Sequence, residues 1–261
     1  METDPHRWIH ALRVSHDALL AQVADLTPAQ LQQGSYCRDW DVAQVLSHLG
    51  SGAEIALVGL ERVLGHREPL NREEFPLIWD RWNALAPEGK ATEMVVWDRR
   101  HVSVLQALDD KTLKSLRMNL FGMDLDAVHI VGLRLGEHAV HSWDVAVSFN
   151  PAAEVLPSSV ELLVDRIPYI AGRLAKPEKA SAKTQIKIKT SHPDRQFLLS
   201  IGDGVALSKD VEGPVDGYLE LTSAALLRLV YGRLDPVHTP PGTNTKGSAN
   251  LDELREIFAG F

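Results

Sequence analysis

The sequence predicts a protein of mixed class, in which an α-helical bundle precedes a small α+β domain. Apolar residues recur with the period of an α-helix through residues 1–152, whereas short runs with a period of two appear within 153–261. The length of 261 residues, with 44% hydrophobic and 24% charged residues, fits a soluble globular protein of two domains or one large one. We therefore place the expected domain boundary between residues 152 and 153.

The first two predicted helices cover residues 5–26 and 41–64. Thr27-Pro28 starts a short element between them, and the second helix is expected to end near Gly65, since glycine is common just after a helix. Both segments carry apolar residues at helical spacing, among them Trp8, Ile9, Leu12, Leu19, Val42, Val45, Leu46 and Leu49.

Two further helical regions complete the predicted bundle. Residues 76–108 are amphipathic, but Pro87 must break or kink this region, so two shorter helices describe it equally well. Residues 125–149 follow a turn-prone segment at 119–122 and end before Pro151. Four amphipathic helices of this kind favour an antiparallel four-helix bundle.

The remaining residues predict the α+β domain. A helix over 158–174 leads into strands over 184–190, 197–201 and 217–222, which alternate or are rich in β-formers and are separated by glycine-containing turns. Helices over 223–231 and 251–258 complete this domain.

Composition excludes several classes of function. The formal net charge of −8 argues against general capture of nucleic acid, which needs clustered Lys and Arg. No apolar run approaches the roughly 20 residues that a membrane-spanning helix requires. The acidic start of the chain lacks the features of a secretory signal, and the single Cys37 fits a reducing compartment, so we expect a cytoplasmic protein. A monomer is the expected state.

The most informative pattern lies in the helix predicted over 125–149. Arg134, Glu137, His141 and Asp144 follow one another at steps of three, four and three, which places them on one stripe. Spacing alone leaves open whether the stripe faces solvent or the bundle. Glu137 and His141 could bind a metal. Arg134 and Asp144 could each orient these ligands or form a surface ion pair, and for Arg134 the surface ion pair is the expectation.

His48 could supply a further ligand, because it lies in an otherwise apolar helix and a buried imidazole needs a hydrogen bond or a metal. A core histidine bonded to a carbonyl is the alternative. Cys37 is expected to be an inert structural thiol, and His138 should point about 100° away from Glu137. Three tryptophans are expected in the bundle core: Trp79, Trp82 and Trp97.

Three segments together resemble one known family. Residues 40–49, Trp-Asp-Val-Ala-Gln-Val-Leu-Ser-His-Leu, look like a segment of DinB-like metal-binding bundles. Residues 137–144, Glu-His-Ala-Val-His-Ser-Trp-Asp, resemble the signature of the mycothiol-dependent maleylpyruvate isomerase family, and residues 225–233 look like a helix of its sterol-carrier-protein-like C-terminal domain. The resemblance covers nearly the whole chain and implies a DinB-like four-helix bundle followed by that domain.

The resemblance also implies a site and a chemistry. It places the metal ligands at His48, Glu137 and His141 and a functionally important arginine at Arg233. The guanidinium of Arg233 could hold a substrate carboxylate, or it could satisfy carbonyl groups at the C-terminal end of its helix. A divalent metal, best guess zinc, would keep one open position for the thiol of mycothiol, the expected cosubstrate. The implied function is a zinc- and mycothiol-dependent isomerase or S-transferase acting on a small electrophile, with maleylpyruvate isomerisation as the specific expectation.

Two alternatives stay open at this stage. The same three ligands could instead hold a metal-bound hydroxide that hydrolyses a thiol conjugate. A non-enzymatic protein that senses a metal or a thiol would show metal affinity without turnover.

Overall fold

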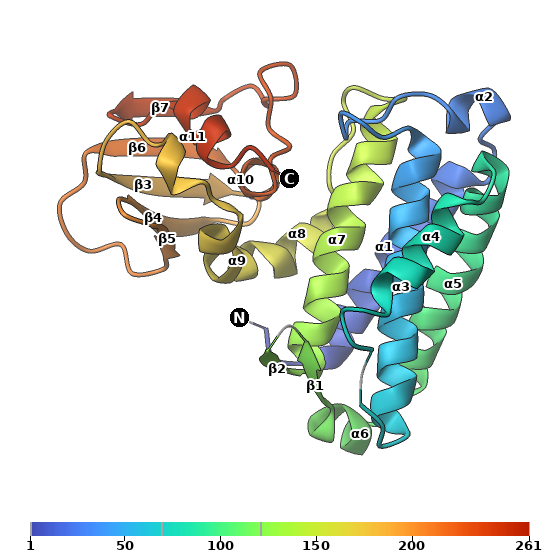
Figure 1. Ribbon diagram of the computed structural model, residues 1–261. Helices are drawn as coiled ribbons and strands as arrows, with labels where there is room; N and C mark the ends of the chain where they lie inside the picture. The colour runs from blue at the N-terminus through green and yellow to red at the C-terminus, as the bar shows by residue number, and fades with distance from the viewer. Residues whose placement is uncertain (1, 69, 121, 261) are drawn as a thin grey trace. The chain divides into compact units, whose positions relative to one another are not determined.

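The computed structural model describes residues 2–68, 70–120 and 122–260. Its internal contacts divide into two compact units, an N-terminal unit over Glu2–Ala153 and a C-terminal unit over Glu154–Phe261. Long helices dominate the N-terminal unit, while the C-terminal unit combines short helices with a sheet (Figure 1). The fold class predicted from the sequence, helical first and α+β second, is confirmed.

Four long helices form the body of the N-terminal unit: α1 (Pro5–Val23), α3 (Val42–Leu64), α5 (Pro87–Ala107) and α7 (Ala127–Val147). They lie side by side in Figure 1, and their facing sides are apolar. One cluster of the core joins residues from all four: Leu19, Val42, Val45, Leu46, Leu49, Ala91, Met94 and Val145. Helical periodicity in the sequence therefore identifies the bundle and its interior.

Short polar side chains fix where the two site-bearing helices begin. The Asp41 carboxylate accepts a hydrogen bond from the backbone N–H of Gln44 at 2.6 Å, at the start of α3. Asp126 does the same for His129 at 2.9 Å, at the start of α7. Each cap satisfies one of the backbone donors that a helix N-terminus leaves unpaired, a contribution of about 1 kcal/mol.

Shorter elements connect the long helices: α2 (Pro28–Leu31), α4 (Phe75–Asn83), α6 (Asp110–Ser115), β1 (Arg117–Leu120) and β2 (Met123–Asp126). The break predicted at Pro87 is confirmed, since α4 and α5 are separate helices. The antiparallel β1–β2 hairpin is not predicted from the sequence, because its four-residue strands are too short to show a period of two.

The tryptophans of this unit occupy different environments. Trp82 is fully buried, and its ring fills space that a side chain at Gly50 would take, since a Cβ there would lie 2.2 Å from the ring. Trp97 is partly buried against the same core. Trp79 is 44% exposed, so its prediction as a core residue is wrong. Trp79 lies one turn after the buried Phe75 and contacts its ring, with centroids 5.8 Å apart, but much of the indole extends beyond the bundle into solvent.

The C-terminal unit is built on a five-stranded sheet with the order β5-β4-β3-β6-β7. Its strands are β3 (Thr184–Ser191), β4 (Arg195–Ile201), β5 (Val205–Ser208), β6 (Gly217–Thr222) and β7 (Asn244–Gly247). The central β3 and β6 are parallel, and the other pairs are antiparallel. The two outer strands β5 and β7, each of four residues, are absent from the prediction because they are too short for a pattern.

Helices α8 (Pro157–Leu163), α9 (Ile167–Leu174), α10 (Ser223–Val230) and α11 (Leu251–Ile257) complete this unit. The single helix predicted over 158–174 is wrong in detail. A 3₁₀ turn over Val164–Arg166 divides it into α8 and α9, where Pro168 cannot donate a hydrogen bond to the preceding turn. None of the helices in the described ranges is long and apolar enough to span a membrane.

Candidate metal centre

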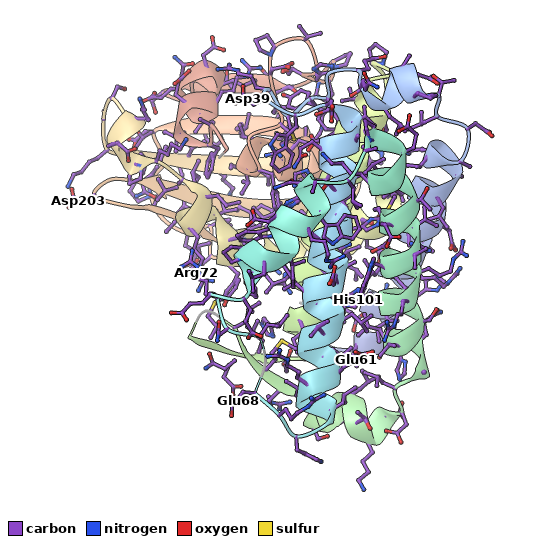
Figure 2. The ribbon with its side chains drawn as sticks, turned by 45° about the vertical axis from the view of Figure 1, so that its right-hand side comes forward. Asp39, Glu61, Glu68, Arg72, His101 and Asp203 are labelled. Carbon is purple, nitrogen blue, oxygen red and sulfur yellow. The ribbon has the colours of Figure 1, made fainter. Side chains whose placement is uncertain are left out.

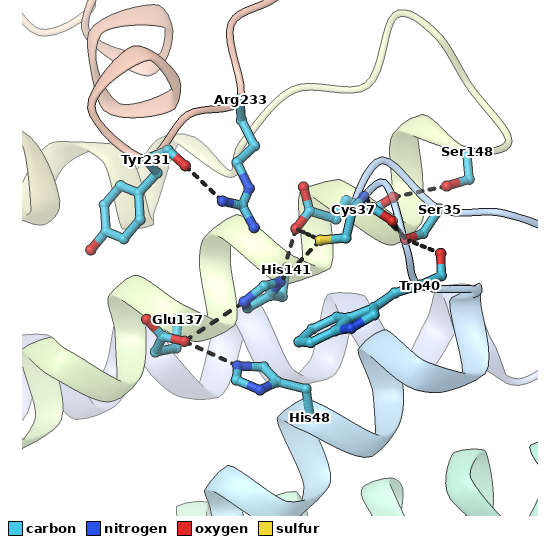
Figure 3. Close-up of polar contacts among 10 residues, drawn as sticks. Ser35, Cys37, Trp40, His48, Glu137, His141, Ser148, Tyr231 and Arg233 are labelled. Carbon is cyan, nitrogen blue, oxygen red and sulfur yellow. Dashed lines mark hydrogen bonds and ion pairs between the residues drawn. The ribbon is translucent and has the colours of Figure 1, made fainter. Parts of the chain in front are cut away.

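The candidate ligands are carried by two neighbouring helices of the N-terminal unit. His48 lies on α3, and Glu137 and His141 lie one turn apart on α7. The i, i+4 spacing stacks Glu137 over His141 on one face of α7, and that face is turned toward α3. Figure 3 shows the three side chains converging from the two helices.

The three predicted ligands lie together. The Nε2 atom of His48 is 3.1 Å from Oε2 of Glu137, and the Nε2 atom of His141 is 3.7 Å from the same oxygen. One donor atom from each residue lies within 4.8 Å of the others. The side chain of His141 is only 10% exposed, whereas those of His48 and Glu137 are 36% and 49% exposed. The group is therefore open to solvent on one side.

Aromatic rings restrict the two imidazoles. The rings of His48 and His141 meet edge to face with their centroids 4.6 Å apart. The indole of Trp40, just before the cap of α3, stacks on His141 at 6.1 Å and leans on His48 at 5.2 Å. Packing of this kind holds each ring in one orientation, which a metal site needs.

Asp144 fixes the tautomer of His141. Its Oδ2 atom accepts a hydrogen bond from Nδ1 of His141 at 2.8 Å, and the carboxylate is fully buried. With the proton held on Nδ1, the lone pair of His141 is on Nε2, the atom that faces Glu137. The same oxygen accepts a hydrogen bond from the thiol of Cys37 at 3.1 Å (Figure 3). Cys37 thus supports the carboxylate that orients His141.

The electrostatics of the group favour the forms that bind metals. Burial alone would raise the pKa of Glu137, but the hydrogen bond from His48 and the charges of His141 and Arg134 outweigh it and lower this pKa to about 2. Burial lowers the pKa of His48 more than its contact with Glu137 raises it. At neutral pH the centre therefore offers a carboxylate and a neutral imidazole, which are the states that coordinate cations.

A second polar cluster lies inside the same bundle, and sequence reasoning missed it. Asp98 on α5 is fully buried, and its Oδ2 atom accepts hydrogen bonds from His16 at 2.6 Å and from His138 at 3.0 Å. Its Oδ1 atom accepts one from Arg134 at 2.7 Å. We call Asp98, His16, His138 and Arg134 the Asp98 cluster. The only local signal for it is the i, i+4 spacing of Arg134 and His138.

The position of Arg134 corrects a sequence-based expectation. Arg134 was expected in a surface ion pair, yet its side chain is only 7% exposed and its partner Asp98 is completely buried. The stripe from Arg134 to Asp144 therefore points into the bundle for most of its length. His138 points away from Glu137 as expected and belongs to the Asp98 cluster instead of the candidate centre.

Arg233 belongs to the C-terminal unit, three residues after the end of α10. Its Nη1 atom donates a hydrogen bond to the carbonyl oxygen of Tyr231 at 2.6 Å, as Figure 3 shows. Gly232 between them adopts a φ of +73°, which glycine allows without strain and which turns the chain at this point. The arginine thus contacts a carbonyl close to the end of its own helix.

The chain resembles known proteins in sequence over residues 12–146 and in fold over 95% of its length. A family model described as the mycothiol maleylpyruvate isomerase N-terminal domain matches residues 12–146. The crystal structure of a mycothiol-dependent maleylpyruvate isomerase is similar with a TM-score of 0.69 and 12% identity, covering 95% of each chain. The crystal structure of a histidine-to-alanine mutant of such an isomerase is similar with a TM-score of 0.68 and 13% identity, again covering 95% of each chain. At this identity the structural likeness establishes the fold. No curated protein matched in the sequence search.

Proposed function

This chain belongs to the family of the mycothiol maleylpyruvate isomerase N-terminal domain, and on that premise we propose that it is a metal- and mycothiol-dependent isomerase. His48, Glu137 and His141 hold one divalent ion in this proposal, with zinc as the expected metal. The observation that carries the proposal is the convergence of two imidazole nitrogens and one carboxylate oxygen at a partly open position.

The spacing of the donor atoms fits such an ion. Ligand atoms at about 2.0–2.1 Å from a tetrahedral zinc ion stand about 3.3 Å apart. The separations of 3.1 and 3.7 Å from Glu137 Oε2 to the two histidine nitrogens lie on either side of this value. Three protein ligands leave a fourth position for an exogenous group, as in catalytic zinc sites. The exposure of His48 and Glu137 provides access to that position.

Each residue of the centre has a defined task in this proposal. Glu137 contributes the negative charge, His48 and His141 contribute neutral nitrogens, and Asp144 keeps the proton of His141 on the nitrogen that faces away from the ion. A divalent cation bound here would favour the thiolate form of a thiol at the open position, because its charge lowers the thiol pKa. Arg233 is proposed to hold a carboxylate of the substrate through its planar pair of donors.

The specific reaction we propose is cis-trans isomerisation of maleylpyruvate. The thiolate of mycothiol adds to the carbon-carbon double bond, and the neighbouring carbonyl takes up the electron pair. Rotation about the resulting single bond follows, and elimination of the thiolate restores the double bond as fumarylpyruvate. No atom is gained or lost overall, so the thiol is consumed and regenerated in each turnover.

The test combines metal content with turnover. We expect about one zinc per chain by elemental analysis of the purified protein, and mycothiol-dependent formation of fumarylpyruvate. His48→Ala and His141→Ala should lose both the metal and the turnover. His10→Ala, which removes an exposed histidine from α1, is the matched control and should retain both.

The possible results separate the competing functions. A metal-free wild-type protein, even after zinc is added back, would contradict the site itself. A metal-loaded protein that releases hydrolysed product without thiol would point to a hydrolase. A metal-loaded protein that yields a stable thiol adduct would point to an S-transferase instead of an isomerase.

A further inference from the structure

Arg134 connects the two helices of the candidate centre immediately next to its ligands. It lies on α7 one turn before Glu137, and its Nη2 atom donates a hydrogen bond to the carbonyl oxygen of Leu49 on α3 at 2.9 Å. Leu49 is the residue that follows His48. The guanidinium therefore joins α7 to α3 within one residue of the first ligand and one turn of the second.

The α3 helix makes room for this guanidinium. A Cβ atom on Gly52 would lie 3.0 Å from Nη1 of Arg134, which is the one close contact that it would make outside the backbone of its own helix among the described residues. Gly52 is one turn after His48, on the same face of α3. Glycine inside a helix is about 1 kcal/mol less favourable than alanine. Its presence here is explained by the space that Arg134 occupies.

Asp98 anchors the same guanidinium inside the bundle. The Nη2 atom that binds Leu49 also donates to Oδ1 of Asp98 at 2.7 Å, and His16 and His138 saturate Oδ2. His138 is itself fixed, since its Nδ1 atom contacts the hydroxyl of Ser15 at 2.8 Å. All the residues in this series of hydrogen bonds are buried, so water cannot replace one of the partners.

The Asp98 cluster thereby ties all four long helices together at one level of the bundle. His16 comes from α1, Asp98 from α5, and His138 and Arg134 from α7, while Leu49 supplies the carbonyl of α3. Coordination requires donor atoms within a few tenths of an ångström of their ideal positions. His48 on α3 and Glu137 on α7 are partly exposed, so their separation depends on how the two helices are held beneath them.

We propose that Arg134, anchored by Asp98, is a positioning residue that sets the spacing of His48 and Glu137 for metal binding. This inference rests on the proposed metal site, but not on the identity of the reaction. Arg134 touches the backbone beside the ligands instead of the ion, so its loss should weaken metal binding without removing a ligand.

The test uses a double variant that removes both charges of the buried pair, Arg134→Met with Asp98→Asn. Removing one partner alone would leave a buried charge without compensation and threaten folding. We expect the dissociation constant for Zn²⁺, measured by competition with a chelator, to rise about 10- to 100-fold. The visible spectrum of the Co²⁺-loaded protein should also change, because it reports ligand geometry.

Glu54→Gln is the matched control. Glu54 also lies on α3, is buried, and accepts hydrogen bonds from Arg81 and from Trp82, the latter at 2.7 Å. Its loss should lower stability while the Zn²⁺ dissociation constant stays within about twofold of the wild type and the Co²⁺ spectrum is unchanged. A purely structural role of Arg134 would make the two variants behave alike.

A second variant keeps the inference testable if the double variant does not fold. Gly52→Ala should raise helix stability but press on the guanidinium, so Zn²⁺ affinity should fall while the unfolding temperature is maintained or rises. Wild-type Zn²⁺ affinity in the folded double variant, or in Gly52→Ala, would overturn the inference. A wild-type protein that binds Zn²⁺ but lacks isomerase activity would contradict only the proposed function.

Discussion

The candidate metal centre and the Asp98 cluster contain the same kinds of side chain but differ in burial and in the hydrogen bonding of the carboxylate. Each brings two histidines and one carboxylate within 4.8 Å, and α7 contributes to both. In the Asp98 cluster the carboxylate is completely buried and hydrogen-bonded through both oxygens. In the candidate centre Glu137 is 49% exposed and its Oε2 faces two imidazole nitrogens.

The difference shows that residue type alone does not define a metal site. Arg134 supplies the positive charge in the Asp98 cluster, so a second cation there would be repelled and would displace satisfied hydrogen bonds. The candidate centre has no such guanidinium bonded to its carboxylate among the described residues. We therefore expect one cluster to maintain the fold and the other to bind the ion.

The largest expected effect comes from removing the carboxylate of the Asp98 cluster. Asp98→Ala leaves Arg134 charged inside the bundle and two histidines without an acceptor, and should lower the free energy of unfolding by about 3–5 kcal/mol. Urea denaturation of the variant and the wild type measures this loss of stability. Asp110→Ala, which removes an exposed partner of His6, should change stability by less than about 1 kcal/mol. If Asp98→Ala lowered the free energy of unfolding by less than about 1 kcal/mol, the buried Asp98 would contribute no more to stability than the exposed Asp110.

Adding zinc should have the next largest effect, because only the folded chain brings the donors together. At about 100 times the dissociation constant, Zn²⁺ should raise the free energy of unfolding by about 2.7 kcal/mol. The increase should be absent in His141→Ala and present in His16→Ala, if that variant folds. Calorimetry that finds two ions per chain would contradict this difference between the two clusters, since the Asp98 cluster would then bind metal as well.

The buried histidines should make stability depend on pH. Burial lowers the pKa of His101 from 6.5 to about 3, and it also lowers the pKa of His138. The unfolded chain then binds more protons than the folded one as pH falls below about 6.5, so the contribution of His101 to stability is complete above that pH and declines toward pH 3. Its slope is up to about 1.4 kcal/mol per pH unit, and His138 acts in the same direction.

His101, labelled in Figure 2, provides the control for this effect. It lies on α5 and is 2% exposed. His101→Leu removes one of the groups that titrate, so urea denaturation between about pH 7 and pH 5 should give a flatter dependence than in the wild type. An unchanged slope in this variant would show that His101 does not contribute to the acid sensitivity.

The smallest expected effect concerns Cys37. Cys37→Ala removes one hydrogen bond to Asp144 and should lower the free energy of unfolding by about 0.5–1.5 kcal/mol. Metal content should stay at one ion per chain in both Cys37→Ala and Cys37→Ser. Loss of the ion from Cys37→Ser would show that the thiol is itself a ligand, since Cys37, His141 and Asp144 also lie within coordination range of one another.

Local patterns made most of the bundle predictable from sequence. The helical period identifies α1, α3 and α7 within a few residues, and the steps between Arg134, Glu137 and His141 reveal one stripe. Period alone could not decide which way the stripe faces, because that depends on the helices packed against it. His48 is 89 residues away from Glu137 along the chain, so only the resemblance to a family connected them.

The Asp98 cluster could not be predicted from the sequence either, because its members are far apart along the chain. His16 and Asp98 are 82 residues apart, and Asp98 and His138 are 40 residues apart. No short motif can report a contact that forms only when three helices meet. The expectation that Arg134 lies at the surface follows the usual behaviour of arginine, and a single buried carboxylate on another helix was enough to reverse it.

Glu137 and His138 are adjacent in the chain yet serve different clusters, and this restricts how the protein can change during evolution. An inserted or deleted residue between Arg134 and His141 would turn the rest of α7 by about 100°. Such a change would move the side chains of α7 away from their partners in both clusters at the same time. Relatives should therefore vary in length within their loops, while this part of α7 changes only by substitution.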